Sequence, residues 1–118
     1  MSLKIGLHRE EEARAYLTAQ GLKWVESNYR CKMGEIDLIM RDGSTLVFVE
    51  VRARSGRDFG GALASVSYAK RQKILKTASL YLVVKQLYDK EMVRFDVLSL
   101  EGIPPQISWI KNAFGSEG

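Results

Sequence analysis

The chain has 118 residues, which is enough for one hydrophobic core and too few for two independent ones. Hydrophobic residues make up 46% and charged residues 27%, a balance typical of soluble globular domains that excludes a disordered chain. The single cysteine, Cys31, excludes an internal disulfide and a zinc site built from several thiolates. No apolar run approaches the roughly 20 residues that span a bilayer, and the charged N-terminus lacks a signal peptide's apolar region, so we expect a cytoplasmic protein without membrane association.

The net charge of +4 is concentrated in one stretch of the chain. Residues 51–76 carry seven basic side chains and one acidic side chain, whereas each flanking segment holds one more acid than base. Such a stretch is a candidate footprint for nucleic acid, with DNA favoured over RNA, although a charge cluster considered alone is more often the solvated face of a helix. The candidate nucleic-acid-binding residues are Arg54, Arg57, Lys70, Arg71, Lys73 and Lys76.

The spacing of apolar residues predicts alternating helices and strands. Gly21 follows the first helical pattern, where a left-handed C-terminal cap belongs. The expected elements, in chain order, are a helix over 7–20, strands over 24–29, 35–40 and 45–53, a helix over 67–87, and strands over 92–100 and 107–110. This order, α-β-β-β-α-β-β, predicts a single α/β domain over residues 1–118, with a mixed β-sheet flanked by helices and a loose tail from about Asn112.

A hairpin turn is predicted at residues 41–44, Arg-Asp-Gly-Ser, between two strands that alternate with period two. A connection centred on this turn pairs Met40 with Thr45 and makes Asp37 a diagonal neighbour of Glu50. Their β-carbons would then lie roughly 5–8 Å apart, a separation from which two carboxylates can share one divalent cation. The alternative is a polar outer face in which the acids pair with nearby arginines.

Alternation along the two strands predicts one charged and one apolar face. The charged face would carry Glu35, Asp37, Glu50, Arg52 and Arg54, and the apolar face Ile36, Leu38, Val47, Val49 and Val51. In the first helix, Glu10 shares a stripe with Ala13 and Leu17 and therefore points inward, which is costly without a partner. That partner is either an arginine of the charged face or a metal site beside Asp37 and Glu50. The metal site would require the three acids to converge on one side of the sheet.

Several motifs carry a family resemblance over residues 6 to about 114. They are Gly6-x-x-x-Glu10-x-x-Ala13, GEIDLI at 34–39, Val47-Phe48-Val49-Glu50-Val51-Arg52-x-Arg54, Phe59-Gly60, Val66-Ser67-x-x-Lys70 and Arg94-Phe95-Asp96-Val97. They resemble the YraN family of bacterial proteins (uncharacterised protein family 0102), which in turn resembles the PD-(D/E)XK nucleases, most closely the archaeal Holliday junction resolvases. The resemblance implies a restriction-endonuclease-like fold, a bound Mg²⁺ or Mn²⁺ ion and a homodimer.

Carried over residue by residue, the resemblance makes Glu10, Asp37 and Glu50 the catalytic and metal-binding acids. The backbone carbonyl of Val51 would be a further metal ligand, and Arg52 occupies the position of the nuclease lysine. A lysine can lose its proton and activate water, whereas arginine stays charged and can only stabilise anionic oxygens.

Two functions therefore remain open. The first is a metal-dependent endonuclease that hydrolyses phosphodiester bonds in branched or single-stranded DNA, or in RNA. The second is a catalytically silent nucleic-acid-binding module with the same fold. A protein-interaction adaptor is a weaker third alternative.

Overall fold

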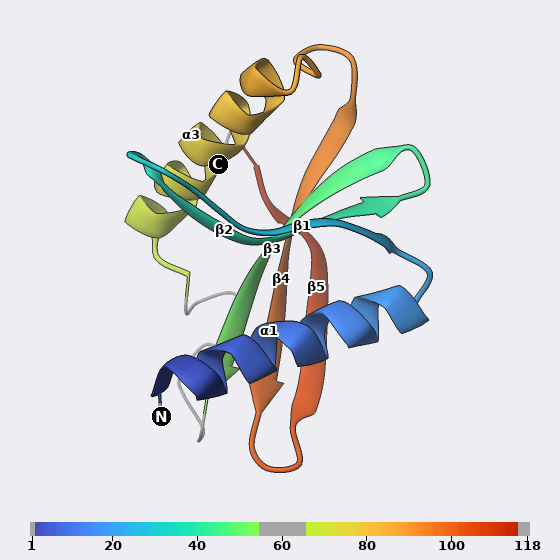
Figure 1. Cartoon of the computed structure of the whole chain (residues 1–118), viewed down its shortest axis with the longest axis vertical. Helices are drawn as coiled ribbons and strands as arrows, with labels where there is room; N and C mark the ends of the chain where they lie inside the picture. Colours follow the sequence, from blue (N-terminus) through green and yellow to red (C-terminus); the bar gives the residue numbers. More distant parts are fainter. Residues whose placement is uncertain (1, 55–65, 116–118) are drawn as a thin grey trace.

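The computed structural model describes the backbone of residues 2–54 and 66–115, with side chains for residues 9–53 and 66–115 (Figure 1). Its elements are α1 (Ser2–Ala19), β1 (Lys23–Cys31), β2 (Gly34–Asp42), β3 (Thr45–Arg54), α3 (Tyr68–Val84), β4 (Met92–Glu101) and β5 (Gln106–Phe114). The expected order α-β-β-β-α-β-β is confirmed. Gly21 adopts the left-handed conformation, with φ of 102°, and ends the turn that follows α1, as its position predicts.

The strands form one mixed sheet in the order β1-β2-β3-β4-β5. Strands β3 and β4 are parallel and the other neighbours are antiparallel. A parallel pair needs a long crossover, and α3 lies in the connection from β3 to β4. This α/β arrangement is consistent with a restriction-endonuclease-like fold.

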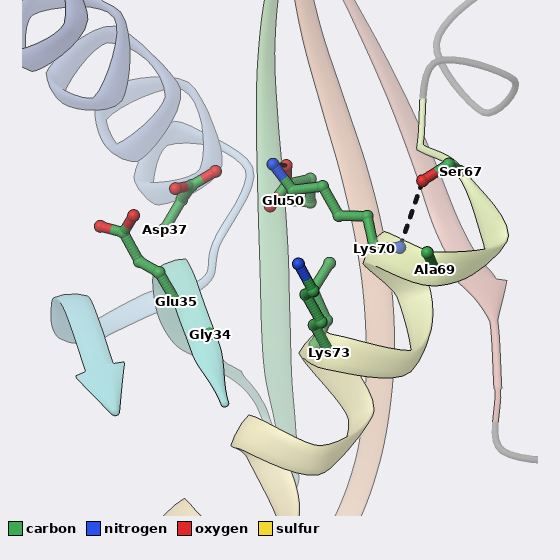
Figure 2. A pocket seen from close by; sticks show the side chains of 9 residues that line it. Gly34, Glu35, Asp37, Glu50, Ser67, Ala69, Lys70 and Lys73 are labelled. Carbon is green, nitrogen blue, oxygen red and sulfur yellow. Dashed lines mark hydrogen bonds and ion pairs between the residues drawn. The ribbon is translucent and has the colours of Figure 1, made fainter. Parts of the chain in front are cut away.

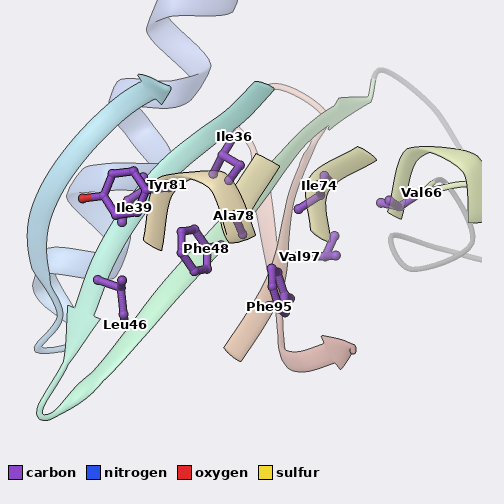
Figure 3. Packing of buried hydrophobic residues seen from close by; sticks show 10 residues of the cluster. All are labelled: Ile36, Ile39, Leu46, Phe48, Val66, Ile74, Ala78, Tyr81, Phe95 and Val97. Atoms are coloured by element: carbon purple, nitrogen blue, oxygen red, sulfur yellow. The ribbon is translucent and has the colours of Figure 1, made fainter. Parts of the chain in front are cut away.

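Hydrophobic residues are buried on both faces of the sheet. Ile74, Ala78 and Tyr81 of α3 pack on one face against a cluster that includes Phe48 (Figure 3). Ala13 and Leu17 of α1 belong to the cluster on the other face. Leu38, Val47 and Val49 share the side under α1, as the alternation predicts, whereas Leu46 and Phe48 are buried under α3, so the side predicted to be charged is also partly core.

The β2–β3 register differs from the predicted one by two residues. Asp42 pairs with Thr45 and Leu38 pairs with Val49, so the turn consists of Gly43 and Ser44. A two-residue shift preserves side-chain parity, which is why residues expected to share a face still do so. The shift does change which residues stand opposite each other along the two strands. It brings Asp37 opposite Glu50, whereas the sequence predicted that the two are diagonal neighbours.

Ile36 also departs from the predicted alternation. It belongs to the cluster under α3, together with Ile39, whereas its neighbour Leu38 belongs to the cluster under α1. The last β2–β3 pair is Leu38 with Val49, so the alternation changes where the two strands cease to pair.

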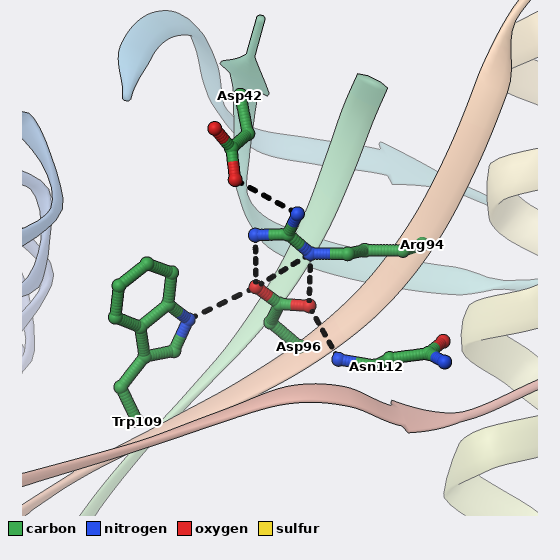
Figure 4. A network of polar contacts seen from close by, with 5 residues as sticks. All are labelled: Asp42, Arg94, Asp96, Trp109 and Asn112. Atoms are coloured by element: carbon green, nitrogen blue, oxygen red, sulfur yellow. Dashed lines mark hydrogen bonds and ion pairs between the residues drawn. The ribbon is translucent and has the colours of Figure 1, made fainter. Parts of the chain in front are cut away.

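The buried carboxylate of Asp96 in β4 forms an ion pair within its own strand and holds β5 to β4 by hydrogen bonds (Figure 4). The Asp96 carboxylate is fully buried and accepts hydrogen bonds from Arg94 Nε at 3.0 Å and Trp109 Nε1 at 2.9 Å. Arg94 Nη1 also donates to Asp42 at 2.8 Å. These charge-assisted bonds satisfy Asp96 in the interior, so we interpret this part of the family motif as structural.

The last strand continues beyond its predicted end at residue 110. The backbone N–H of Asn112 donates to Asp96 Oδ1 at 2.9 Å, and the ring of Phe114 stacks on Phe95. A loose tail beginning near Asn112 is therefore wrong for residues 112–114, because the polar network and the aromatic stack order them. Residues 116–118 lie outside the described residues.

Candidate functional site

Glu50 is a buried carboxylate held between two cations. It lies in β3 on the face covered by α3, and only 3% of the residue is exposed. Its Oε2 atom is 2.9 Å from Lys70 Nζ and 3.5 Å from Arg52 Nη1. Part of the arginine-pairing alternative is therefore present, since Arg52 does contact Glu50, but the nearer cation comes from α3.

Asp37 faces Glu50 where β2 and β3 separate. Its Oδ2 accepts the backbone N–H of Val51 at 2.8 Å, just beyond the last paired residues of the two strands. Burial, and then the negative charge of Glu50, raise the pKa of Asp37 to about 8, although the Val51 hydrogen bond opposes this shift. A side-chain interaction with Glu50 also raises the pKa of Asp37, so this site favours the protonated form of Asp37.

Glu10 joins this pair from α1. Its side-chain interactions include Asn28 and Asp37, and burial raises its pKa whereas the Asn28 hydrogen bond lowers it. The inward direction predicted from its helical stripe is confirmed. Because α1 and α3 cover opposite faces, the three acids meet through the gap between β2 and β3, and not on one side of the sheet as expected.

Asn28 was not identifiable from the sequence. It has a left-handed backbone conformation, with φ of 55°, inside β1, and asparagine tolerates that conformation better than most residues. A lone asparagine in a strand pattern carries no information about a partner in a distant helix.

A pocket of about 420 Å³ opens beside the acids, between β2, β3 and the start of α3 (Figure 2). Acidic side chains of the strands face lysines of the helix across it. The lining residues are Gly34, Glu35, Asp37, Glu50, Ser67, Ala69, Lys70, Lys73 and Ile74. Glu35, which the sequence placed on the charged face without a role, lines this pocket and pairs with Arg30 at 3.0 Å.

The start of α3 is capped, and its next turns pack closely on the start of β2. Ser67 caps the helix, and its Oγ accepts the N–H of Lys70 at 3.2 Å. A β-carbon added to Gly34 would lie 3.1 Å from Thr77 Oγ1 and 3.3 Å from Lys73 Cβ. This close approach explains glycine at the start of β2, and it brings the lysines of α3 over the acids.

The carboxylates suit a hard divalent cation. Among the described residues, no three Asp, Glu, His or Cys side chains are arranged to enclose one ion. Mg²⁺ does not need such a cage, since it commonly uses one or two carboxylates, several waters and phosphate oxygens of the substrate. Asp37 and Glu50 fit that pattern: burial and then the negative charge of Glu50 raise the pKa of Asp37, and a bound cation would offset that charge.

The candidate nucleic-acid-binding residues lie in different environments. Lys70 and Lys73 line the pocket, and Lys76 is exposed on α3. Arg71 instead donates from Nε to the carbonyl of Val66 at 2.9 Å, which anchors the start of α3. The side chain of Arg54 and the whole of Arg57 lie outside the described residues.

None of the helices in the described part of the chain is long and apolar enough to cross a membrane.

Comparison with known proteins identifies the family. The sequence profile described as "Uncharacterised protein family UPF0102" matches residues 9–100. A UPF0102 protein of Legionella pneumophila (strain Philadelphia 1) is 52% identical over 114 residues, covering 97% of both chains. A UPF0102 protein of Alkalilimnicola ehrlichii is 45% identical over 116 residues, covering 98% of this chain and 90% of its own. With its profile match and these full-length relatives, the chain belongs to the UPF0102 family.

Proposed function

We propose that this protein is a metal-dependent nuclease that hydrolyses phosphodiester bonds in nucleic acid, with DNA as the favoured substrate. The observation that carries the proposal is the buried Asp37–Glu50 pair, which faces two lysines across an open pocket. Two carboxylates in contact are unfavourable for folding unless they hold a proton or a cation. Clustered groups with perturbed pKa values are characteristic of functional sites.

Asp37 and Glu50 would hold Mg²⁺ or Mn²⁺, with the nearby carbonyl of Val51 as a further ligand expected from the family resemblance. When bound, the ion supplies Lewis-acid stabilisation of the phosphoryl group and lowers the pKa of water. In the reaction, a water oxygen bonds to phosphorus and the bond from phosphorus to the leaving sugar oxygen breaks. The electron pair stays on that oxygen, which takes a proton from solvent, and the attacking water loses one proton to solvent.

Other residues of the pocket would orient the reactants. Glu10, beside Asp37, is suited to accept a hydrogen bond from the attacking water. Lys73 and Lys76 lie on exposed parts of α3 and are suited to contact phosphates on either side of the reacting one. Tyr68 is 68% exposed near the Ser67 cap, where it could stack on a base or sugar.

The test is cleavage of labelled single-stranded, duplex and four-way-junction DNA, and of RNA, with Mg²⁺, with Mn²⁺ and with chelator. We expect cleavage that requires the metal and that Asp37→Asn lowers at least about 100-fold. Asp89→Asn is the matched control, since Asp89 is exposed and is not among the described pocket-lining residues. Absence of metal-dependent cleavage on every substrate would refute the nuclease proposal.

The alternative, a silent nucleic-acid-binding module, is favoured by one observation. Arg52 occupies the position of the nuclease lysine and contacts Glu50 at 3.5 Å, as a fixed neutralising charge would. This function predicts salt-dependent binding to DNA that is unchanged by metal and by Asp37→Asn. The same variant therefore separates the two functions.

A further inference from the structure

We propose that Lys70, and not Arg52, is the catalytic cation of this centre. Lys70 would donate hydrogen bonds to the attacking water and to a non-bridging phosphate oxygen. This inference rests on the proposed nuclease function and assigns a role that the family resemblance gives to the position of Arg52. Lys70 and Arg52 both contact the same oxygen atom of Glu50, Oε2.

Distance favours Lys70. Its Nζ atom lies 2.9 Å from Glu50 Oε2, which is hydrogen-bonding range, whereas Arg52 Nη1 lies 3.5 Å away. A cation in direct contact with a metal-binding carboxylate is close to any phosphate that shares the ion. The lysine ammonium is also compact and carries three rotatable donors, so it can contact a water and a phosphate oxygen together.

Access to the pocket favours the same residue. Lys70 lines the pocket with Asp37 and Glu50, and 45% of its side chain is exposed. Arg52 is not among the described pocket-lining residues, and 31% of its side chain is exposed. Figure 2 shows Lys70 extending from α3 to Glu50, with Lys73 beside it. Lys70 is therefore placed between the acids and the open side of the pocket.

The backbone that carries Lys70 is well anchored. Ser67 Oγ accepts the Lys70 N–H, and the Ser67 carbonyl accepts the Arg71 N–H at 2.9 Å. The side chain of Arg71 then binds the carbonyl of Val66. These contacts fix the position of the first turn of α3 and therefore the backbone position from which the Lys70 side chain extends. A catalytic group requires such preorganisation.

The first measurement compares Lys70→Met with Lys73→Met, since both lysines line the same pocket one helical turn apart. Under single-turnover conditions with saturating DNA and Mn²⁺, we expect Lys70→Met to cleave at least about 100-fold more slowly than wild type. Its DNA affinity should fall much less than its rate, because the other phosphate contacts remain. Lys73→Met should instead weaken DNA binding, and Lys90→Met, at an exposed position that is not among the described pocket-lining residues, should match wild type in rate and affinity. A wild-type rate for Lys70→Met would overturn the assignment.

The second measurement needs no activity and uses the wild-type protein, which guards against misfolding of the methionine variant. The ammonium resonance of Lys70 is assigned in a ¹⁵N spectrum by its loss in Lys70→Arg. We expect it to shift when Mg²⁺ and a phosphorothioate oligonucleotide are added together, because the ammonium leaves Glu50 for the phosphate. An unchanged resonance would show that Lys70 is only a structural partner of Glu50 and would overturn the inference. A shifted resonance with no cleavage on any substrate would refute the nuclease function while leaving Lys70 as the phosphate contact.

Discussion

Replacing Asp37 with asparagine should stabilise the metal-free protein, by an amount that grows as the pH rises. The pKa of Asp37 is raised from 3.8 to about 8 by burial and by Glu50. A group whose pKa is raised by folding binds more protons in the folded state, so stability is full below pH 4 and falls as the pH rises towards 8. Asparagine has no proton to lose, and its amide oxygen can still accept the N–H of Val51.

The size of this stabilisation depends on the pH range over which stability is compared. Each proton taken up on folding changes the free energy of unfolding by at most about 1.4 kcal/mol per pH unit, so the two units between pH 5.5 and 7.5 give an upper limit of ~3 kcal/mol. Lys70 and Arg52 lie beside Glu50 and offset part of the repulsion. We therefore expect the stability difference between Asp37→Asn and wild type to grow by about 1–2 kcal/mol over this range.

Urea unfolding in chelator at pH 5.5, 6.5 and 7.5 measures this difference. Subtracting the wild-type curve removes the contribution of carboxylates that titrate in both proteins. The control variant Asp89→Asn, at an exposed position, should have the same free energy of unfolding as wild type at each pH. A variant that is less stable than wild type at pH 7.5, or a difference that does not change with pH, would refute the account of the acid pair.

Three further predictions concern the same acids and the buried network. Mn²⁺ should raise the melting temperature of wild type more at pH 8 than at pH 6, because a proton competes for Asp37, and Asp37→Asn should abolish the effect in thermal melts. Asp96→Ala should cost about 3–5 kcal/mol in urea unfolding, because it leaves Arg94 without its buried partner, yet calorimetry should find Mn²⁺ affinity unchanged. Glu10→Gln should slow metal-dependent cleavage at least about tenfold. The matched variant Glu11→Gln, at the exposed next residue of α1, should cleave at the wild-type rate. Equal rates for the two variants would exclude a role for Glu10.

The elements and two of the acids could be predicted from local pattern. Strand alternation survives a register shift of two residues, so Asp37 and Glu50 were expected to share a face and lie close together despite the wrong pairing. The inward direction of Glu10 followed from helical periodicity alone. These properties depend on the spacing of neighbouring residues, which the chain order determines without knowledge of packing.

What packs against each face was decided only by the tertiary structure. The turn at Gly43 and Ser44 set the level at which Asp37 meets Glu50, and the separation of β2 from β3 let Glu10 approach from the opposite helix. Lys70 reaches Glu50 across the long connection between β3 and α3, and neither residue's local sequence encodes that contact. Hydrophobic periodicity specifies direction from a single helix or strand, whereas a site assembled from both faces of a sheet depends on how several elements pack together.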